Sequence, residues 1–250
     1  ISPEDLNIAA TSKGDIMAYV TDELVAAAGL MDGYTPPANA YAGADAAKAL
    51  LARAYLYTQQ WDKAATTALE VIQNRVPAYT ETENSFTSSS FDALYDESSA
   101  HDMVLLKVDF MNDESVNALA DWCMPDARFE VSAWESTAEE ASVANLYEAA
   151  DLRIPMTVTT KDPDNPNYYC NKYQDFETDK DNVLVLRMAE QYLIAAEALN
   201  EIAFVANGQA FDLLNQVRLR AGASAYSAGD APGQEFFREL VQQERRLELA

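Results

Sequence analysis

The sequence predicts a mainly α-helical protein built from tetratricopeptide-like helical hairpins, with an irregular, loop-rich middle region that contains a few short strands. Two observations carry this prediction. The 250 residues include 43 alanines but only 8 glycines, a balance that favours closely packed helices over turn-rich β architecture. Apolar residues also recur at helical spacing towards both ends of the chain, and this spacing is absent from the middle.

The first expected helix covers residues 16–31. We place its N-cap at Asp15, and Gly33 with the prolines that follow ends it. Its apolar positions are spaced three or four residues apart: Ile16, Val20, Leu24, Ala27 and Met31.

Residues 46–74 predict a helical hairpin. Its first helix is rich in alanine and apolar on two adjacent faces, so it needs neighbours on both sides, as stacked hairpins provide. Ala52, Tyr55 and Ala64 match the small, tyrosine and alanine positions of the tetratricopeptide pattern. Trp61 opens the second helix, where we expect a structural role.

Residues 183–250 repeat this pattern. We expect a helix from Val185 to Leu199, a partner helix over residues 210–221 that Gly222 closes, and a final helix from Phe236 onwards. The helical scaffold is thus predicted over 16–74 and 183–250, within a single domain.

Residues 85–182 form the predicted irregular region. Met103–Val108 has the composition of a short strand, residues 145–150 of a short helix, and residues 154–160 and 168–173 of extended segments.

Charge and motif content exclude several functions. The formal net charge of −24 makes nucleic acid an improbable partner, because phosphate binding needs clustered Lys and Arg. His101 is the only histidine, which removes schemes that need two. No nucleophile elbow, Walker loop or zinc-protease motif occurs. We therefore expect no catalysis, no metal and no cofactor.

One acidic segment resembles the opening of a calcium loop, with Asp175, Glu177, Asp179 and Asp181 at alternate positions. Lys180 stands where such a loop needs Gly, and the closing Glu is also missing. We expect a solvated acidic loop.

The candidate ligand-binding residues lie in the irregular region: Trp122, Asp126, Arg128, Phe129 and Trp134. A flat aromatic face can stack on a sugar ring while carboxylate and guanidinium groups bind its hydroxyls. The alternative is that these rings anchor a long loop to the core. Cys123 and Cys170 are compatible with a disulfide, two free thiols or no role.

Three blocks in the C-terminal part carry a resemblance. Residues 183–200 (VLVLRMAEQYLIAAEALN), 214–222 (LNQVRLRAG) and 244–249 (ERRLEL) resemble, in this order, blocks of the SusD/RagB family of lipoproteins. Residues 50–61 and the Asp-Leu-Arg of 151–153 add to it, so that the resemblance covers nearly the whole chain.

The resemblance implies a cell-surface lipoprotein of the Bacteroidetes type that takes part in nutrient uptake and polysaccharide utilisation. Such a protein binds a glycan or another nutrient for a TonB-dependent SusC-type outer-membrane transporter, and its helical scaffold faces that transporter. Neither a signal peptide nor a transmembrane run occurs, so we expect part of a longer chain, attached to the membrane only through an N-terminal lipid anchor absent from this sequence.

Charged residues within these blocks suggest structural roles. Arg187 and Glu190, and again Arg245 and Glu248, are three residues apart, a spacing that bridges helical turns or ties neighbouring helices together. Two alternative functions stay open: a tetratricopeptide-type scaffold that binds proteins, and an acid-rich glycosidase that uses two carboxylates.

Overall fold

The computed structural model describes residues 11–75, 103–110, 118–120, 146–159, 169–175, 177–178 and 180–249. The fold is mainly helical, as predicted. The long helices are α1 (Lys13–Leu30), α2 (Ala44–Tyr57), α3 (Trp61–Arg75), α7 (Met188–Ile202), α8 (Gln209–Arg220) and α9 (Gln234–Leu249). The short elements are β1 (Val104–Val108), α6 (Ile154–Thr157), β2 (Val158–Thr159), β3 (Tyr169–Cys170) and β4 (Val183–Arg187). Among these helices, none is both long and apolar enough to cross a membrane.

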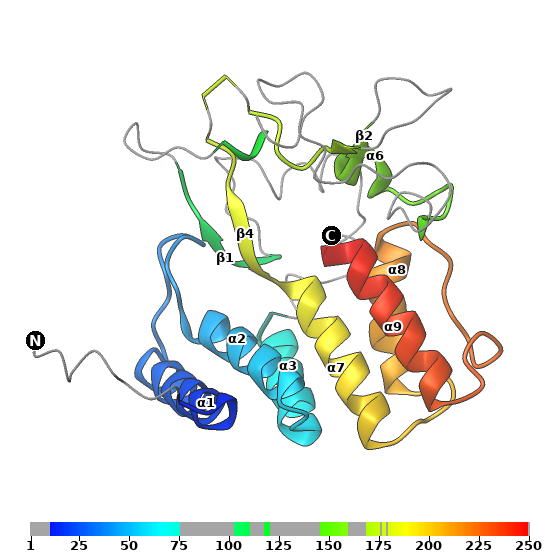
Figure 1. Ribbon diagram of the computed structural model, residues 1–250, viewed down its shortest axis with the longest axis horizontal. Coiled ribbons are helices and arrows are strands. Elements are labelled where there is room, and N and C mark those ends of the chain that lie inside the picture. The colour runs from blue at the N-terminus through cyan, green and yellow to red at the C-terminus, as the bar shows by residue number, and fades with distance from the viewer. Residues whose placement is uncertain are drawn as a thin grey trace, which may run out of the picture.

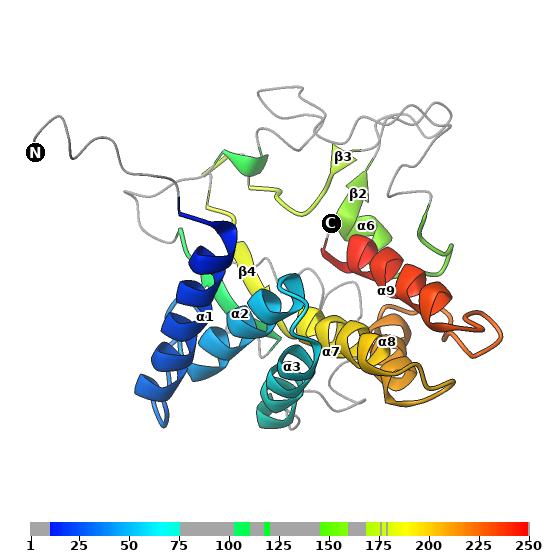
Figure 2. The ribbon, with the colours of Figure 1, turned by 60° about the horizontal axis from the view of Figure 1, so that its bottom comes forward.

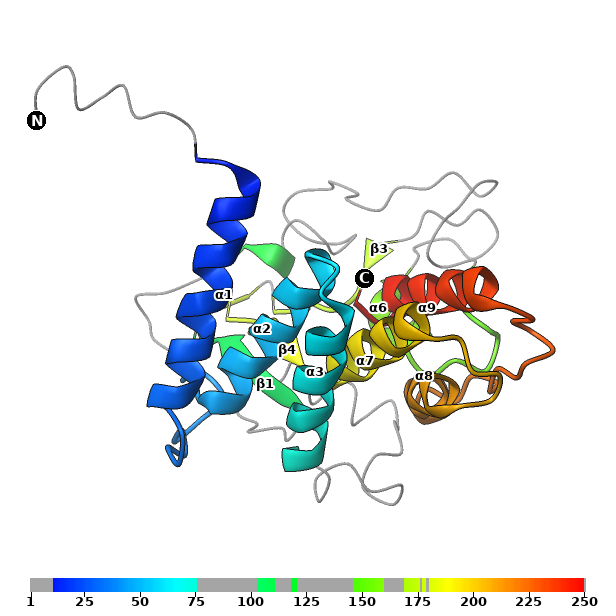
Figure 3. The ribbon, with the colours of Figure 1, turned by 90° about the horizontal axis from the view of Figure 1, so that it is seen from below.

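The long helices pack in one continuous series. Helix α1 packs against α2, α2 against α3, α3 against α7, and α7 against both α8 and α9 (Figures 1 and 2). Residues 76–187 separate α3 from α7 in the sequence, yet these two helices lie side by side (Figure 3). The residues between them are therefore an insertion into a helical frame that is continuous in space.

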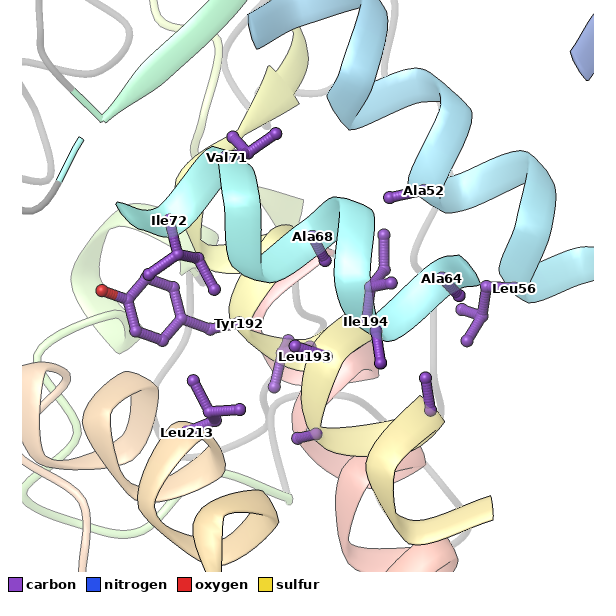
Figure 4. Packing of buried hydrophobic residues seen from close by; sticks show 14 of the residues in the cluster. Ala52, Leu56, Ala64, Ala68, Val71, Ile72, Tyr192, Leu193, Ile194 and Leu213 are labelled. Atoms are coloured by element: carbon purple, nitrogen blue, oxygen red, sulfur yellow. The ribbon is translucent and has the colours of Figure 1, made fainter. Parts of the chain in front are cut away.

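Small residues allow the helices of this frame to approach closely. Ala52, Ala64 and Ala68 have no exposed surface. Figure 4 shows Tyr192 of α7 between Ile72 of α3 and Leu213 of α8, so that one ring joins both sides of the series. Burial raises the pKa of this tyrosine to about 12, since the ionised form would lose its hydration.

The tetratricopeptide-like hairpin is confirmed in α2 and α3. Tyr55 is buried with the two alanines of the pattern, and Trp61 opens α3 and packs partly buried against the core. Gln59 in the turn has a positive φ of 59°, and the amide of Gln60 donates to the carbonyl oxygen of Tyr55. The turn is therefore tight enough to bring the two helices together.

Three predicted boundaries are wrong. Helix α1 begins at Lys13 because Ser12, and not Asp15, is its N-cap: the Ser12 hydroxyl accepts from the amide of Asp15 and donates to its carboxylate. Residues 183–187 form strand β4, and helix α7 begins only at Met188. Residues 154–157 are helical, so that strand covers only 158–159 in the described part of the predicted extended segment.

Strands β1 and β4 form an antiparallel pair within the insertion, with β4 at its C-terminal end. The predicted strand at Met103–Val108 is confirmed as β1, which pairs with β4 from Val104 opposite Arg187 to Val108 opposite Val183. The ladder continues into the helix start, where the amide of Met188 donates to the carbonyl oxygen of Met103. Strands β2 and β3 form a second antiparallel pair.

Gly222 ends α8, as predicted, and also positions the insertion. Its φ of +73° is unfavourable for residues with a side chain, and a Cβ there would lie 3.1 Å from the carbonyl oxygen of Ala150. The neighbouring amide of Leu152 donates to the carbonyl oxygen of Ala221. The chain around residue 151 therefore rests directly on the end of α8.

Candidate functional site

The predicted ligand-binding residues lie outside the part of the chain that the structure describes: Trp122, Asp126, Arg128, Phe129 and Trp134. His101 and Cys123 lie outside it as well. The roles of these residues, and a Cys123–Cys170 disulfide, stay predictions. The structure does describe how the insertion is attached to the helical frame.

The attachment is a cluster of charged side chains around the C-terminal half of α9. Figure 1 shows the C-terminal end of this helix beside α6. Seven of its eight members are buried and one is partly exposed. Four are cations and four are anions, so their formal charges cancel. We call it the charge cluster: Glu148, Asp151, Arg153, Arg187, Arg218, Arg220, Glu244 and Glu248.

Arg153 is the centre of the charge cluster and has no exposed surface. It binds Asp151 through two nitrogens, with Nη2 2.7 Å and Nε 2.9 Å from the carboxylate oxygens. Its Nη1 lies 2.6 Å from Glu244 and 2.9 Å from Glu248. Burial opposes the charge on Arg153, but the bonds to Asp151 and the two glutamates outweigh it and raise the pKa.

Glu248 joins three arginines. Its carboxylate lies 2.9 Å from Arg153, 3.0 Å from Arg187 and 3.3 Å from Arg220. Burial acts to raise the pKa of Glu248, and the three guanidinium groups lower it below its usual value. Burial lowers the pKa of Arg220 to about 10, against the effect of Glu248 and Glu244, which leaves Arg220 charged at neutral pH.

Arg218 connects α8 to the start of the described insertion segment. It binds Glu244 at 2.7 Å, pairs with Glu148, and donates to the carbonyl oxygen of Ser224. Its guanidinium also stacks 3.7 Å from the ring centre of Tyr226. Hydrogen bonds from the amide and hydroxyl of Ser224, together with Arg218, lower the pKa of Glu148.

The charge cluster holds both ends of the segment 154–186. Arg153 and Arg187 meet at the single carboxylate of Glu248, so the segment 154–186 leaves the frame and returns to it at the same point. Each of the eight side chains has a partner of opposite charge. This arrangement supports anchoring, because each buried charge is held in place by a partner of opposite sign.

The predicted helical-turn pairs have different partners. Arg187 binds Glu248 rather than Glu190, because it precedes α7 and has strand geometry. Glu190 binds Arg53 of α2 through two bonds of 2.6 and 2.7 Å, and Arg245 of α9 lies 3.9 Å away. The structural role predicted for these residues is confirmed, and they tie neighbouring helices together instead of bridging turns.

The acidic loop binds its own backbone. The carboxylate of Asp175 accepts from the amides of Thr178 and Lys180, and Asp181 accepts from the amide of Asp175. Burial acts to raise the pKa of Asp175, and the bonds from Thr178 and Lys180 lower it. Over the residues described, no three His, Cys, Asp or Glu side chains are grouped as a metal site requires.

A family model described as the SusD family matches residues 124–250, just over half of the chain. The chain belongs to the SusD family. All eight residues of the charge cluster lie inside the matched region. Five of them stand in the three blocks of the resemblance, and Asp151 and Arg153 form the Asp-Leu-Arg match, so the resemblance was the signal in the sequence that pointed to seven of the eight.

Individual SusD-like proteins are also similar to this chain. SusD-like protein P25 of Formosa agariphila is 44% identical over 72 residues, which are 28% of this chain and 13% of that protein. A SusD-like carbohydrate binding protein from Bacteroides vulgatus has a TM-score of 0.77 at 22% identity, over 97% of this chain and 50% of its own. A laminarin binding SusD-like protein has a TM-score of 0.72 at 20% identity, over 100% of this chain and 61% of its own.

These structural similarities show the SusD-like fold. This chain spans about half the length of the solved SusD-like proteins.

Proposed function

We propose that this chain binds a glycan through the irregular region 85–182 and passes it, chemically unchanged, to a TonB-dependent SusC-type transporter. The observation that carries the proposal is membership of the SusD family. One solved SusD-like relative is described as laminarin binding and another as carbohydrate binding, which supports a glycan as the ligand class.

The architecture also supports binding rather than catalysis. A rigid frame reduces the conformational freedom that a binding loop loses when it holds a ligand, and this raises affinity. Anchoring of the 154–186 segment at Glu248 has this effect on part of the insertion. Trp122 and Trp134 are proposed to stack on sugar rings, with Phe129 beside them and with Asp126 and Arg128 binding hydroxyls.

Electrophoresis of the full-length protein through gels that contain laminarin, xylan, galactomannan or alginate tests the proposal. We expect retardation by at least one polysaccharide, and loss of that retardation when Trp122 and Trp134 are both replaced by Ala. Phe236→Ala, at an apolar residue of α9 that is 53% exposed, is the control and should bind normally. If none of the four polysaccharides retards the protein, glycan binding is refuted. If the protein releases reducing ends from any of them, it is a catalyst and the proposal of binding alone is wrong.

A transporter partner fits the exposed apolar side chains of α1. Leu30 is 88% exposed, Tyr19 65% and Ile16 48%, and their spacing puts all three on one side of α1, although the helix packs against α2. Apolar groups gathered on one surface are typical of interaction sites. We place the protein at the cell surface of the outer membrane, anchored by a lipid at the N-terminus of the full-length chain.

Co-purification from outer membranes tests this partner. Leu30→Glu should reduce recovery of a transporter with the full-length lipoprotein, because it puts a charge on the apolar face. Val205→Glu, at an apolar residue that is 60% exposed between α7 and α8, is the matched control. Equal recovery with both variants excludes this face of α1.

The alternative, a scaffold that binds proteins, has one observation in its favour. A groove on the helical frame is lined by Val25 of α1, Leu51 and Tyr55 of α2, and Lys63 of α3. Such a groove can hold an extended segment of a partner. This alternative is preferred if every polysaccharide gel shows no retardation and a purified partner binds through residues 46–74.

A further inference from the structure

A pocket of about 200 Å³ lies at the start of α2, on the helical frame. The loop between α1 and α2 forms one wall, and the ends of α2 and α3 form the other. Leu105 of β1 contributes to the lining. The described part of this pocket shares no residue with the charge cluster or with segment 154–186.

The loop that forms the pocket is held in one shape. Gly33 has a φ of +74°, a conformation that favours glycine. Pro36 packs so closely on Gly43 that a Cβ at residue 43 would lie 2.8 Å from its Cγ. The amide of Lys107 in β1 donates to the carbonyl oxygen of Asn39 at 3.0 Å. These contacts preform the pocket, so a ligand would not need to order the loop first.

Two aromatic rings and several polar groups line the pocket. Tyr34 is 50% exposed and Tyr41 57% exposed, so both rings offer apolar surface to a ligand. Asp32, Lys48 and Asn74 bring hydrogen-bonding groups to the same space. Aromatic faces beside hydroxyl-binding groups are the combination that suits a sugar, which has an apolar ring face and a polar rim.

The charges of the lining cancel, and the cations are already paired. Arg75 binds Asp45 at 2.8 Å, and Asn74 donates to the same carboxylate at 3.2 Å. Lys48 binds Glu70 at 2.5 Å. With two acids and two bases in the lining, an anionic ligand would have to displace an existing pair, which disfavours carboxylates, sulfates and phosphates.

We propose that this pocket binds one neutral pyranose unit, as a second saccharide site in addition to the one proposed in the irregular region. Tyr34 and Tyr41 stack on the ring, and Asp32 and Asn74 bind its hydroxyls. The pocket is smaller than the roughly 300–1,000 Å³ of sites for drug-sized ligands, so it holds a single unit of a longer glycan. A glycan that reaches both sites would bind more tightly than to either alone.

Nuclear magnetic resonance of the full-length protein with ¹³C-labelled tyrosine rings tests the second site. The probes are the methyl β-pyranosides of glucose, galactose, mannose and xylose, with glucuronate as the anionic comparison. We expect at least one neutral probe to shift the Tyr34 and Tyr41 signals in a saturable way, while the exposed Tyr19 and Tyr57 signals stay in place. Tyr34→Ala combined with Tyr41→Ala should weaken that sugar's binding about tenfold or more, as measured from the sugar's own signals.

Three results would overturn the second site: unshifted Tyr34 and Tyr41 with all four neutral probes, an equal response of Tyr19, or stronger binding of glucuronate. Failure here is separable from failure of the proposed function. Protein that carries Trp122→Ala and Trp134→Ala should keep the sugar-induced shifts of the tyrosine signals. Protein that carries Tyr34→Ala and Tyr41→Ala should keep the tryptophan-dependent retardation in the polysaccharide gels.

Discussion

Replacing Glu248 by Gln removes one negative charge from the charge cluster and keeps the shape of the side chain. In the native protein this carboxylate, which has no exposed surface, faces Arg153, Arg187 and Arg220 at 2.9, 3.0 and 3.3 Å. The amide of Gln has one oxygen to accept hydrogen bonds, and its NH₂ group would point at a guanidinium. The cluster would then hold four cations and three anions.

The expected loss of stability follows from the burial of these charges. Removing one partner of a buried ion pair costs about 3–5 kcal/mol, because the charge that is left behind cannot regain its hydration. Since the melting temperature of a domain of this size falls by about 2–4 °C per kcal/mol, we expect Glu248→Gln to lower it by roughly 6–20 °C.

Thermal unfolding followed by circular dichroism measures this loss. The control is Glu239→Gln, the same chemical change at an exposed residue of the same helix, which should alter stability by no more than about 0.5 kcal/mol. If both variants melt within about 2 °C of the unchanged protein, the charge cluster contributes no net stability, and our account of the anchor is wrong.

Three further predictions concern stability. In the folded state the arginines outweigh burial and lower the pKa of Glu248 below its usual value of 4.5. The contribution of ionised Glu248 to the free energy of unfolding is therefore complete above pH 4.5 and is lost as the pH falls through the folded-state pKa. The difference in free energy of unfolding between the unchanged protein and Glu248→Gln should therefore shrink as the pH is lowered. A difference that does not change with pH would contradict this prediction. Urea denaturation compares two glycine replacements. Gly29→Ala in α1, where an added Cβ meets nothing within 4 Å, should stabilise the folded protein by up to about 1 kcal/mol. Gly222→Ala should destabilise it by about 1–3 kcal/mol, because residue 222 has a positive φ. Equal effects of the two would contradict this. Arg53→Lys should lower the free energy of unfolding by about 1 kcal/mol, because Lys cannot make both hydrogen bonds to Glu190. The loss is modest because the Arg53 side chain is 25% exposed. An unchanged urea midpoint would show that this ion pair does not contribute to stability.

Local features of the fold could be predicted from the sequence. The alanine-rich faces and Tyr55 predicted the hairpin of α2 and α3, and Gly222 predicted the end of α8, because these patterns act over a few residues. The prediction of a helix from Val185 is wrong for residues 185–187, because a short apolar run does not distinguish a strand from a buried helix. The long-range pairing with β1 decides its conformation.

The charge cluster illustrates what local patterns cannot show. Arg153 and Glu248 are 95 residues apart, and Arg187 and Glu248 are 61 apart. The spacing of Arg187 and Glu248 within their own blocks predicted pairs that bridge turns or tie neighbouring helices, whereas the fold brings together four separate segments. The pocket at Tyr34 and Tyr41 was missed for a similar reason, since the loop looked only like the end of a helix until β1 and α3 closed it.

The position of the glutamates in the chain has a consequence for biosynthesis. Within the charge cluster, Arg187 and Arg220 pair with Glu248 of α9, so their partner is synthesised after them. The hairpin of α2 and α3 needs only neighbouring residues and can form early, since local contacts close small loops. Segment 154–186 can be anchored at Glu248 only after α9 has been synthesised. The charge cluster is therefore complete only once α9 is present.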